Sequence, residues 1–377
     1  MKEGVTMQSS MDERTFLEFY ENSLLCYSQN LQRFICKALE QEHRITYDQQ
    51  MNLQDDRNVL YFESKNDYKD IISKTSTNRA FINFYEAFEF KKLYKYSVPL
   101  FFEFDSDMGI NDLFEDKQVI LFDVNEYESQ FVIDSALKKA TPLVLLDNDK
   151  AFIKFVIQKT YVKTDTYEPV DYRYPIVIYI DLSLNILEIR YDSLKFGGQI
   201  ESEPYSMIVK DCIAWLKNNL PITLFSCDHD DIISIINDKT NTDVLMYKQM
   251  MELNSGAAAE LTASGEKDSI LPFIGEIREL IDDNEDLFNE SDNIKQLLLQ
   301  YLKEKEETAS YPYIYVKWIK PVVSKSYIVR ITFDYFNNKY TLLQHITGNC
   351  TDLGMGRMND AIKYLCESRS FVKGETI

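Results

Sequence analysis

The sequence predicts a mixed α+β fold: a long N-terminal helix and an α/β layer, then two antiparallel βββα modules separated by an acidic helical insertion. Three patterns support this prediction. Apolar residues recur every three or four positions near the N-terminus, strand-like and helix-like segments alternate after residue 58, and alternating apolar residues with turn signals dominate after residue 150. The 377 residues are enough for two or three domains of about 150 residues each. We expect four segments, namely 1–150, 151–250, 251–310 and 311–377.

Residues 12–43 are predicted to form one long amphipathic helix. Phe16, Tyr20, Leu24 and Ile35 fall on one helical stripe, and further apolar residues widen it. We therefore expect one side of this helix to be well covered.

Between residues 58 and 149, short apolar segments alternate with helical ones. This alternation predicts an α/β layer with parallel pairing. The only glycine in the region is Gly109, so a glycine-rich nucleotide-binding loop is not expected. The expected strands are 59–62, 98–104, 119–122 and 143–146, and the expected helices are 67–73, 79–93 and 126–139.

After residue 150 the pattern favours antiparallel strands. Small polar residues at 252–268 indicate an exposed linker, and Asn337-Asn338 indicates a tight turn because Asn tolerates positive φ. The expected strands are 151–162, 175–181, 186–192, 311–320, 326–335 and 339–346. The expected helices are 204–220, 230–236, 272–283, 292–307 and 355–367.

The two later regions resemble each other, which suggests an internal repeat. Both have the predicted order strand, strand, strand, helix, and Asp211 to Leu216 matches Asp360 to Leu365 in pattern. The alternative is that any two βββα units share such an apolar alternation.

The charge distribution limits the function. Acidic residues outnumber basic ones by 61 to 41, giving a net charge of −20, which disfavours broad binding to nucleic acid or anionic membranes. Residues 250–310 carry 15 acidic and 5 basic side chains, whereas residues 311–377 carry 5 acidic and 9 basic ones. The sequence has no signal-peptide-like start and no apolar run of membrane-spanning length. With six dispersed cysteines, we expect a cytoplasmic protein with reduced thiols and no zinc site.

Aspartates that follow apolar strands form the first candidate site. If the strands are parallel, their carboxyl ends meet at one edge, where paired aspartates are suitable ligands for Mg²⁺. The alternative is that these side chains cap helices and turns. The candidates are Asp105, Asp107, Asp123, Asp147 and Asp149.

A hairpin carries the second candidate. Asp181, Glu188 and Arg190 resemble the acid, acid and cation arrangement of metal-dependent nucleases, with Arg in the place of Lys. Arginine does not release a proton, which weakens the match. Alternation of polar residues on an exposed sheet face is the other interpretation.

Aromatic residues are frequent in the C-terminal strands, with basic residues between them. Alternation assigns Tyr311, Tyr313 and Tyr315 to one face of a strand. The other aromatic residues are Trp318, Tyr327, Phe333, Tyr335 and Tyr340, and the basic residues near them are Lys317, Lys320, Lys325, Arg330 and Lys339. Such a face can stack the bases of a single-stranded nucleic acid, provided that it is open. High β-propensity and core packing are the alternative explanation.

The acidic insertion is the candidate partner-binding element. Residues 276–292 hold eight carboxylates, and such a density is favourable only when it is solvated or faces a basic surface. A solvated helix face is the alternative. The residues assigned to a partner are Glu276, Glu279, Asp282, Asp283 and Asp286.

Together these features favour a non-catalytic binding or assembly subunit of a cytoplasmic bacterial complex. The residue bias is typical of an AT-rich bacterial genome, and mobile-element or phage-defence complexes are the context we expect. The expected partner is a protein with a basic surface, or a second copy of the chain, with no cofactor. Two alternatives stay open: a Mg²⁺-dependent phosphoesterase or nuclease that uses the strand-end aspartates, and an acidic mimic of nucleic acid.

Overall fold

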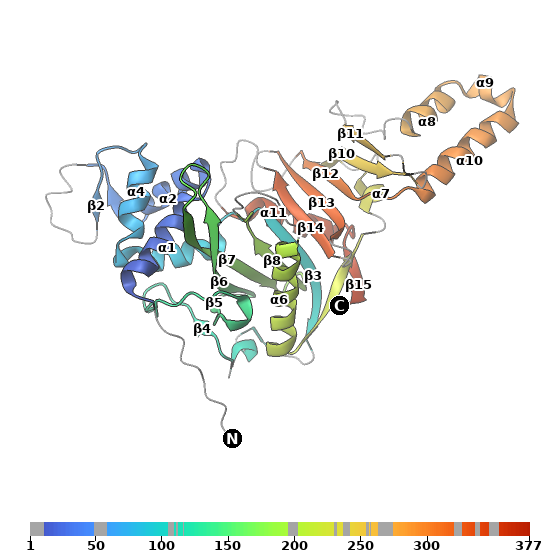
Figure 1. Cartoon of the computed structure of the whole chain (residues 1–377). Coiled ribbons are helices and arrows are strands. Elements are labelled where there is room, and N and C mark those ends of the chain that lie inside the picture. The colour runs from blue at the N-terminus through green and yellow to red at the C-terminus, as the bar shows by residue number, and fades with distance from the viewer. Residues whose placement is uncertain are drawn as a thin grey trace. The chain divides into compact units, whose positions relative to one another are not determined.

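The computed structural model (Figure 1) gives the chain a mixed α+β fold with N-terminal helices and mostly antiparallel strands, as predicted. The chain divides into two compact units. The first comprises residues 1–93, 104–183 and 187–222, and the second comprises 94–103, 184–186 and 223–377. The structure describes residues 11–48, 59–104, 109–110, 112–115, 117–194, 203–229, 232–236, 242–253, 256, 258–262, 274–319, 326–335, 340–346 and 354–377.

The first unit begins with two helices where the sequence predicts one. α1 (Glu13–Leu25) is capped by Asp12, and the Ser28 hydroxyl accepts a hydrogen bond from the Leu31 N–H at the start of α2 (Gln29–Gln41). The prediction of one continuous helix over 12–43 is wrong. The apolar spacing continues through the break between the two helices, so the spacing does not reveal it. With α4 (Tyr68–Ser76) and α5 (Ile82–Lys91), these helices enclose an aromatic-rich core.

The strands of the first unit pair in the order β8-β7-β6-β5-β4. The long strands β6 and β7 are antiparallel, as are β5 and β6, whereas β4 and β5 are parallel. The expected parallel pairing therefore holds for β4 with β5 and for β2 (Leu60–Tyr61), which pairs in parallel with β1 (Ile45–Thr46), but not for β5 with β6. The bounds are β4 (Ile120–Leu121), β5 (Leu143–Asp147), β6 (Lys150–Val162), β7 (Pro169–Asp181), β8 (Ile186–Tyr191) and the helix α6 (Glu203–Asn219).

The predicted helix at 126–139 is wrong. Only its end is helical, as the 3₁₀ turn Leu137–Lys139, and Phe131 has a positive φ of 51°. The Asp134 carbonyl accepts a hydrogen bond from the Gln158 N–H (2.7 Å), so this segment is bonded to the edge of β6. Tertiary hydrogen bonds replace those of a helix here.

The second unit has the strand order β11-β10-β12-β13-β14-β3, and β9 pairs with both β3 and β15. Four strands are not predicted by the sequence, and one of them, β11, lies inside the expected linker: β9 (Ile222–Asp228), β10 (Val244–Glu252), β11 (Ala258–Thr262) and β15 (Val372–Thr376). The other strands are β3 (Tyr96–Phe104), β12 (Tyr313–Trp318), β13 (Tyr327–Tyr335) and β14 (Tyr340–Ile346). The helices are α7 (Ile232–Ile236), α8 (Ile274–Asp283), α9 (Glu285–Asn289), α10 (Asp292–Thr308) and α11 (Gly356–Glu367). The expected turn at 337–338 lies outside the described residues.

Both regions of the suspected repeat have three consecutive strands, a helix and a further strand. In the first the order is β6-β7-β8-α6-β9, and in the second it is β12-β13-β14-α11-β15. The shared order is consistent with an internal duplication, which stays a hypothesis because a similar order of elements does not establish a common origin.

Among the helices of the described residues, none combines the length and the apolar character that crossing a membrane requires.

Candidate functional site

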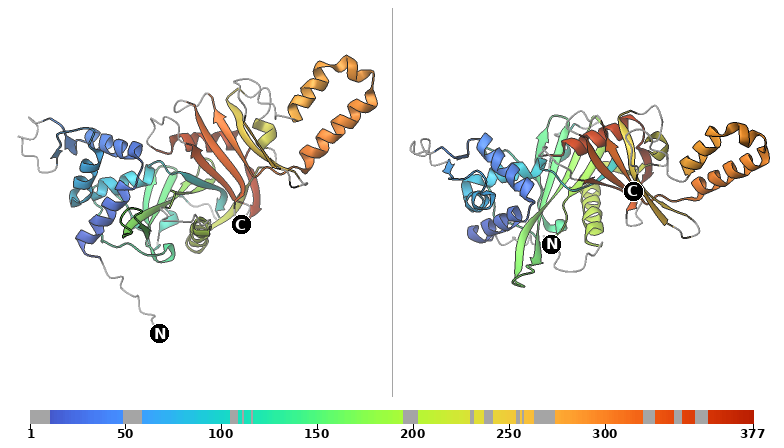
Figure 2. Two further views of the ribbon diagram at one scale, coloured as in Figure 1. Left: turned by 45° about the horizontal axis from the view of Figure 1, so that its top comes forward. Right: turned by 90° about the horizontal axis from the view of Figure 1, so that it is seen from above.

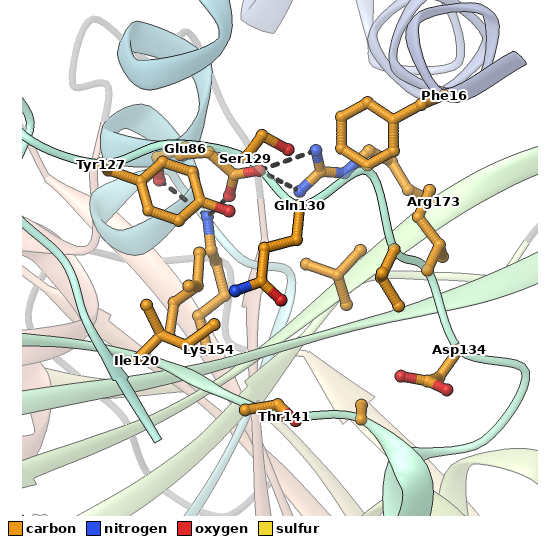
Figure 3. A pocket seen from close by; sticks show the side chains of 15 residues that line it. Phe16, Glu86, Ile120, Tyr127, Ser129, Gln130, Asp134, Thr141, Lys154 and Arg173 are labelled. Carbon is orange, nitrogen blue, oxygen red and sulfur yellow. Dashed lines mark hydrogen bonds and ion pairs between the residues drawn. The ribbon is translucent and has the colours of Figure 1, made fainter. Parts of the chain in front are cut away.

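A small pocket in the first unit is lined by buried charged residues. Its volume is about 70 Å³, and Figure 3 shows the side chains around it. Glu86 comes from α5, Lys154 from β6 and Arg173 from β7, while Tyr127, Ser129 and Gln130 come from the extended segment before β5. Phe16, Asp134, Thr141 and several aliphatic residues complete the lining.

The charged residues form an ion-pair network with Glu89, the residue three positions after Glu86 on α5. Both terminal nitrogens of Arg173 donate to Glu86 Oε1 at 3.0 Å, and its Nη2 also donates to Glu89 Oε2 at 2.8 Å. Lys154 Nζ donates to both carboxylates and to the Glu86 carbonyl. The four side chains are at most 3% exposed. We name Glu86, Glu89, Lys154 and Arg173 the buried network.

Aromatic rings hold the two cations in place. The Arg173 guanidinium lies 3.6 Å from the centre of the Tyr20 ring, and Lys154 Nζ lies 4.5 Å from that of Phe90. The Tyr20 hydroxyl donates to Glu86. These contacts with the ring faces favour the charged forms of Lys154 and Arg173 inside an apolar core.

Burial controls the proton affinities in the network. It raises the pKa of Glu89 to about 7, although the nearby Lys154 acts in the opposite direction. Burial also raises the pKa of Glu86 and lowers that of Arg173. Desolvation therefore outweighs the ion pairs, as is common for buried charges.

The pocket itself has limited chemistry. Its acids and cations are ion-paired with one another, and Glu89 does not line it. Arg173 Nε is buried with no hydrogen-bond partner among the described residues. Because each water needs about 10–15 Å³ of such space, the pocket has room for a few waters or a very small polar molecule. We interpret the buried network as the connection that fixes α5 to β6 and β7.

Sequence reasoning missed this network, although it leaves a signal. Lys154 lies in the apolar run FIKFVI, and Arg173 precedes the apolar run YPIVIYI. A charged residue inside such a strand is rarely buried without a partner.

The strand-end aspartates take part in turns and surface contacts. Asp147 ends β5 and Asp149 lies in the tight turn of the antiparallel β5–β6 hairpin, and Asp147 pairs with Lys91 at 2.9 Å, which lowers its pKa. Asp123 accepts a hydrogen bond from the Asn125 N–H at 2.7 Å. Asp105 and Asp107 lie outside the described residues. In the described parts of the chain, no three His, Cys, Asp or Glu side chains gather in a way that could hold a metal ion.

The hairpin candidate is buried, so the expectation of an exposed sheet face is wrong there. Glu188 and Arg190 are both 1% exposed and form a bidentate pair, with N···O distances of 3.0 and 2.6 Å. Asp181 accepts hydrogen bonds from the Tyr179 hydroxyl and from Ser183. Both oxygens of the Glu188 carboxylate are therefore engaged by Arg190.

The acidic insertion forms a helical hairpin, which we name the arm (residues 274–308). In Figures 1 and 2, α8 and α10 run side by side and α9 joins them at the tip. Ile281 and Leu302 are buried between the helices, next to Met251 of β10. The side chains of Glu276 and Glu279 lie outside the described residues.

Exposed carboxylates gather at the tip of the arm. Asp282 and Asp283 end α8, where the helix dipole disfavours anions and no basic residue lies in the last turn. Lys295 pairs with Glu285 at 3.5 Å and neutralises part of the charge. The exposed acids of the tip are Asp282, Asp283, Glu285, Asp286, Glu290 and Asp292.

Apolar side chains are also exposed on the arm. Ile294, Leu297 and Tyr301 of α10 are 55%, 67% and 44% exposed. Five of the twelve large apolar side chains that are exposed in the described residues lie on this hairpin, Leu280 and Leu287 being the other two. Scattered exposed apolar residues are ordinary, whereas a concentration on one element is typical of an interaction surface.

Comparison with known proteins assigns the chain to no family. No protein-family model matches it, and no curated protein is significantly similar to it. The function therefore has to be inferred from the residues and geometry of the chain itself.

Proposed function

We propose that the chain is a non-catalytic binding subunit that docks a partner protein through the arm. The observation that supports this proposal best is the row Ile294, Leu297 and Tyr301, exposed beside a tip rich in carboxylates. The charges of the buried network and of the hairpin pair Glu188–Arg190 are paired with one another, which favours a structural role for both.

The spacing of the exposed row suits insertion into a groove. Positions 294, 297 and 301 follow the i, i+3, i+7 pattern and fall within about 60° of one another around an α-helix. Helices that bind grooves use anchors at this spacing. The row flanks the inner side of α10, where Leu298 and Leu302 pack toward α8, so docking would extend an existing apolar surface.

The charge of the tip specifies the chemistry of the partner. Six exposed carboxylates at 282–292 face solvent, and Lys295 pairs with one of them. A groove lined by apolar residues and rimmed by Lys or Arg would satisfy both features. A mimic of nucleic acid would need charge without apolar anchors, so the exposed row favours a protein partner.

Affinity capture with matched variants tests the proposal. The full-length chain is used as bait in a lysate of the source organism, at about 50 and 500 mM salt, because screening weakens exposed charge contacts. Leu297→Ser with Tyr301→Ser removes the anchors, and Asp282→Lys with Asp286→Lys reverses the tip charge. The expected result is one protein with a basic surface that the native chain retains and that both variants lose.

Two controls make the test specific. Met207→Ser removes an apolar side chain that is 62% exposed on α6, and Asp165→Lys with Glu168→Lys reverses two exposed acids on the β6–β7 turn. Both should retain the partner. Equal capture by all variants, or a second copy of the chain as the only bound protein in light scattering, would contradict the proposal.

A further inference from the structure

One face of the sheet in the second unit carries a row of aromatic and cationic residues across five strands. Adjacent strands place these residues directly opposite one another, so all lie on one face. In order across the strands, the row is Lys248, Tyr315, Arg330, Gln344 and Tyr96. Each is half-buried, so part of each side chain reaches solvent.

The opposite face of the same strands is covered. α11 packs there, where the Tyr327 hydroxyl donates to Asp360 at 3.0 Å and Trp318 meets the Tyr364 ring edge-on. Val316, Val329 and Leu343 are buried on this covered side. The row thus lies on the face of the sheet that α11 does not cover. Stacking of bases on these aromatic residues requires such an open face.

Cations and rings alternate in contact along the open face. The Arg330 guanidinium lies 4.0 Å from the centre of the Tyr313 ring and 5.8 Å from that of Tyr315. Lys248 Nζ lies 5.5 Å from the Tyr315 ring, and Lys95 Nζ lies 5.2 Å from the Tyr96 ring.

The described cations of this face outnumber the acid that lies beside them. Arg330 and Lys317 form no ion pair with another described residue, and the buried Arg330 Nε has no hydrogen-bond partner there. The acid Glu260 is bound by Lys248 at 2.7 Å and by the Tyr313 hydroxyl at 2.9 Å. We name Lys248, Tyr313, Tyr315, Lys317, Arg330, Gln344 and Tyr96 the stacking face. It has a local excess of cations although the whole chain has a net charge of −20.

We propose that the stacking face binds single-stranded nucleic acid. Tyr315 and Tyr96 offer flat surfaces for bases, Arg330 and Lys317 offer charge to phosphates, and Gln344 can hydrogen-bond to base edges. Four strand spacings of about 4.8 Å give the row a length of about 19 Å, which is room for a few nucleotides. A duplex would present its bases stacked internally, so the single strand is the expected form. This site is independent of the arm.

Fluorescence anisotropy tests the proposal with the full-length chain. The probes are fluorescein-labelled (dT) and (rU) oligomers of about 12 nucleotides and a duplex of equal length. We expect dissociation constants of about 1–100 µM at moderate salt, the range of non-specific binding, and weaker binding of the duplex. Tyr315→Ala should weaken binding about 5- to 100-fold, the range measured for base–aromatic stacking, and Arg330→Lys should weaken it less than Arg330→Ala.

Matched controls distinguish this face from the rest of the surface. Tyr167→Ala on the β6–β7 turn and Lys363→Ala on α11 remove an exposed aromatic ring and an exposed cation elsewhere, and both should bind like the native chain. Circular dichroism and melting confirm that each variant is folded. An anisotropy that does not change at about 100 µM protein, or equal binding by the stacking-face and control variants, would overturn the proposal.

Discussion

Replacing Glu89 by Gln should change how the stability of the protein depends on pH. Burial raises the pKa of Glu89 to about 7 in the folded chain, from 4.5 for an ordinary Glu. Because the folded state then binds the proton more tightly than the unfolded state, the group stabilises folding below pH 4.5 and loses this contribution as the pH rises to about 7. The shift corresponds to about 3 kcal/mol.

The neutral amide of Glu89→Gln resembles the protonated carboxyl group and does not titrate. Urea unfolding of both proteins at pH 5 and pH 8 gives the two free energies of unfolding. We expect the free energy of unfolding of the variant, relative to that of the native chain, to rise by about 3 kcal/mol from pH 5 to pH 8. Glu128→Gln, at an exposed position in the same unit, serves as the control and should follow the native curve. Parallel curves for Glu89→Gln and the native chain would refute the assignment of a raised pKa to this carboxyl group.

Three further predictions concern the fold and the arm. Lys154→Met leaves Glu86 and Glu89 with Arg173 as their ion-pair partner. Urea unfolding should show that the first unit loses about 3–5 kcal/mol of stability. A loss below about 1 kcal/mol would show that Lys154 is not an essential ion-pair partner. Ser28→Ala removes the cap of α2 and should lower the free energy of unfolding by about 1 kcal/mol, whereas an unchanged value would mean that the helix break does not depend on this cap. Asp282→Lys and Asp283→Lys place cations at the end of α8 and should raise the melting temperature slightly, while a lower melting temperature would show that these acids stabilise the arm.

The sequence predicts most elements whose periodicity is long and regular. The hairpin of β7 and β8, the helices α5, α6 and α11, and the strands β12 to β14 follow directly from apolar spacing. The local pattern also marks the acidic helices of the arm, although it does not show that Ile294, Leu297 and Tyr301 stay exposed.

The errors arise where tertiary contacts override local pattern. The segment around Phe131 has a helical composition but is not helical, and its carbonyl groups accept hydrogen bonds from Met11 and Gln158. β11 contains alanines and lies in a small polar segment, yet it pairs with β10 along five positions. Pairing partners distant in sequence cannot be deduced from local propensity.

Site-specific photo-crosslinking tests the central claim, docking through the arm, most directly. A photo-reactive amino acid replaces Leu297 in one version of the full-length chain and Met207 in another, and both are illuminated in cells of the source organism. The two positions are similarly exposed, at 67% and 62%. We predict an adduct from position 297 alone, to a protein whose crosslinked peptide is apolar and flanked by Lys or Arg. No adduct from position 297, or the same adducts from both positions, would contradict the proposed docking surface.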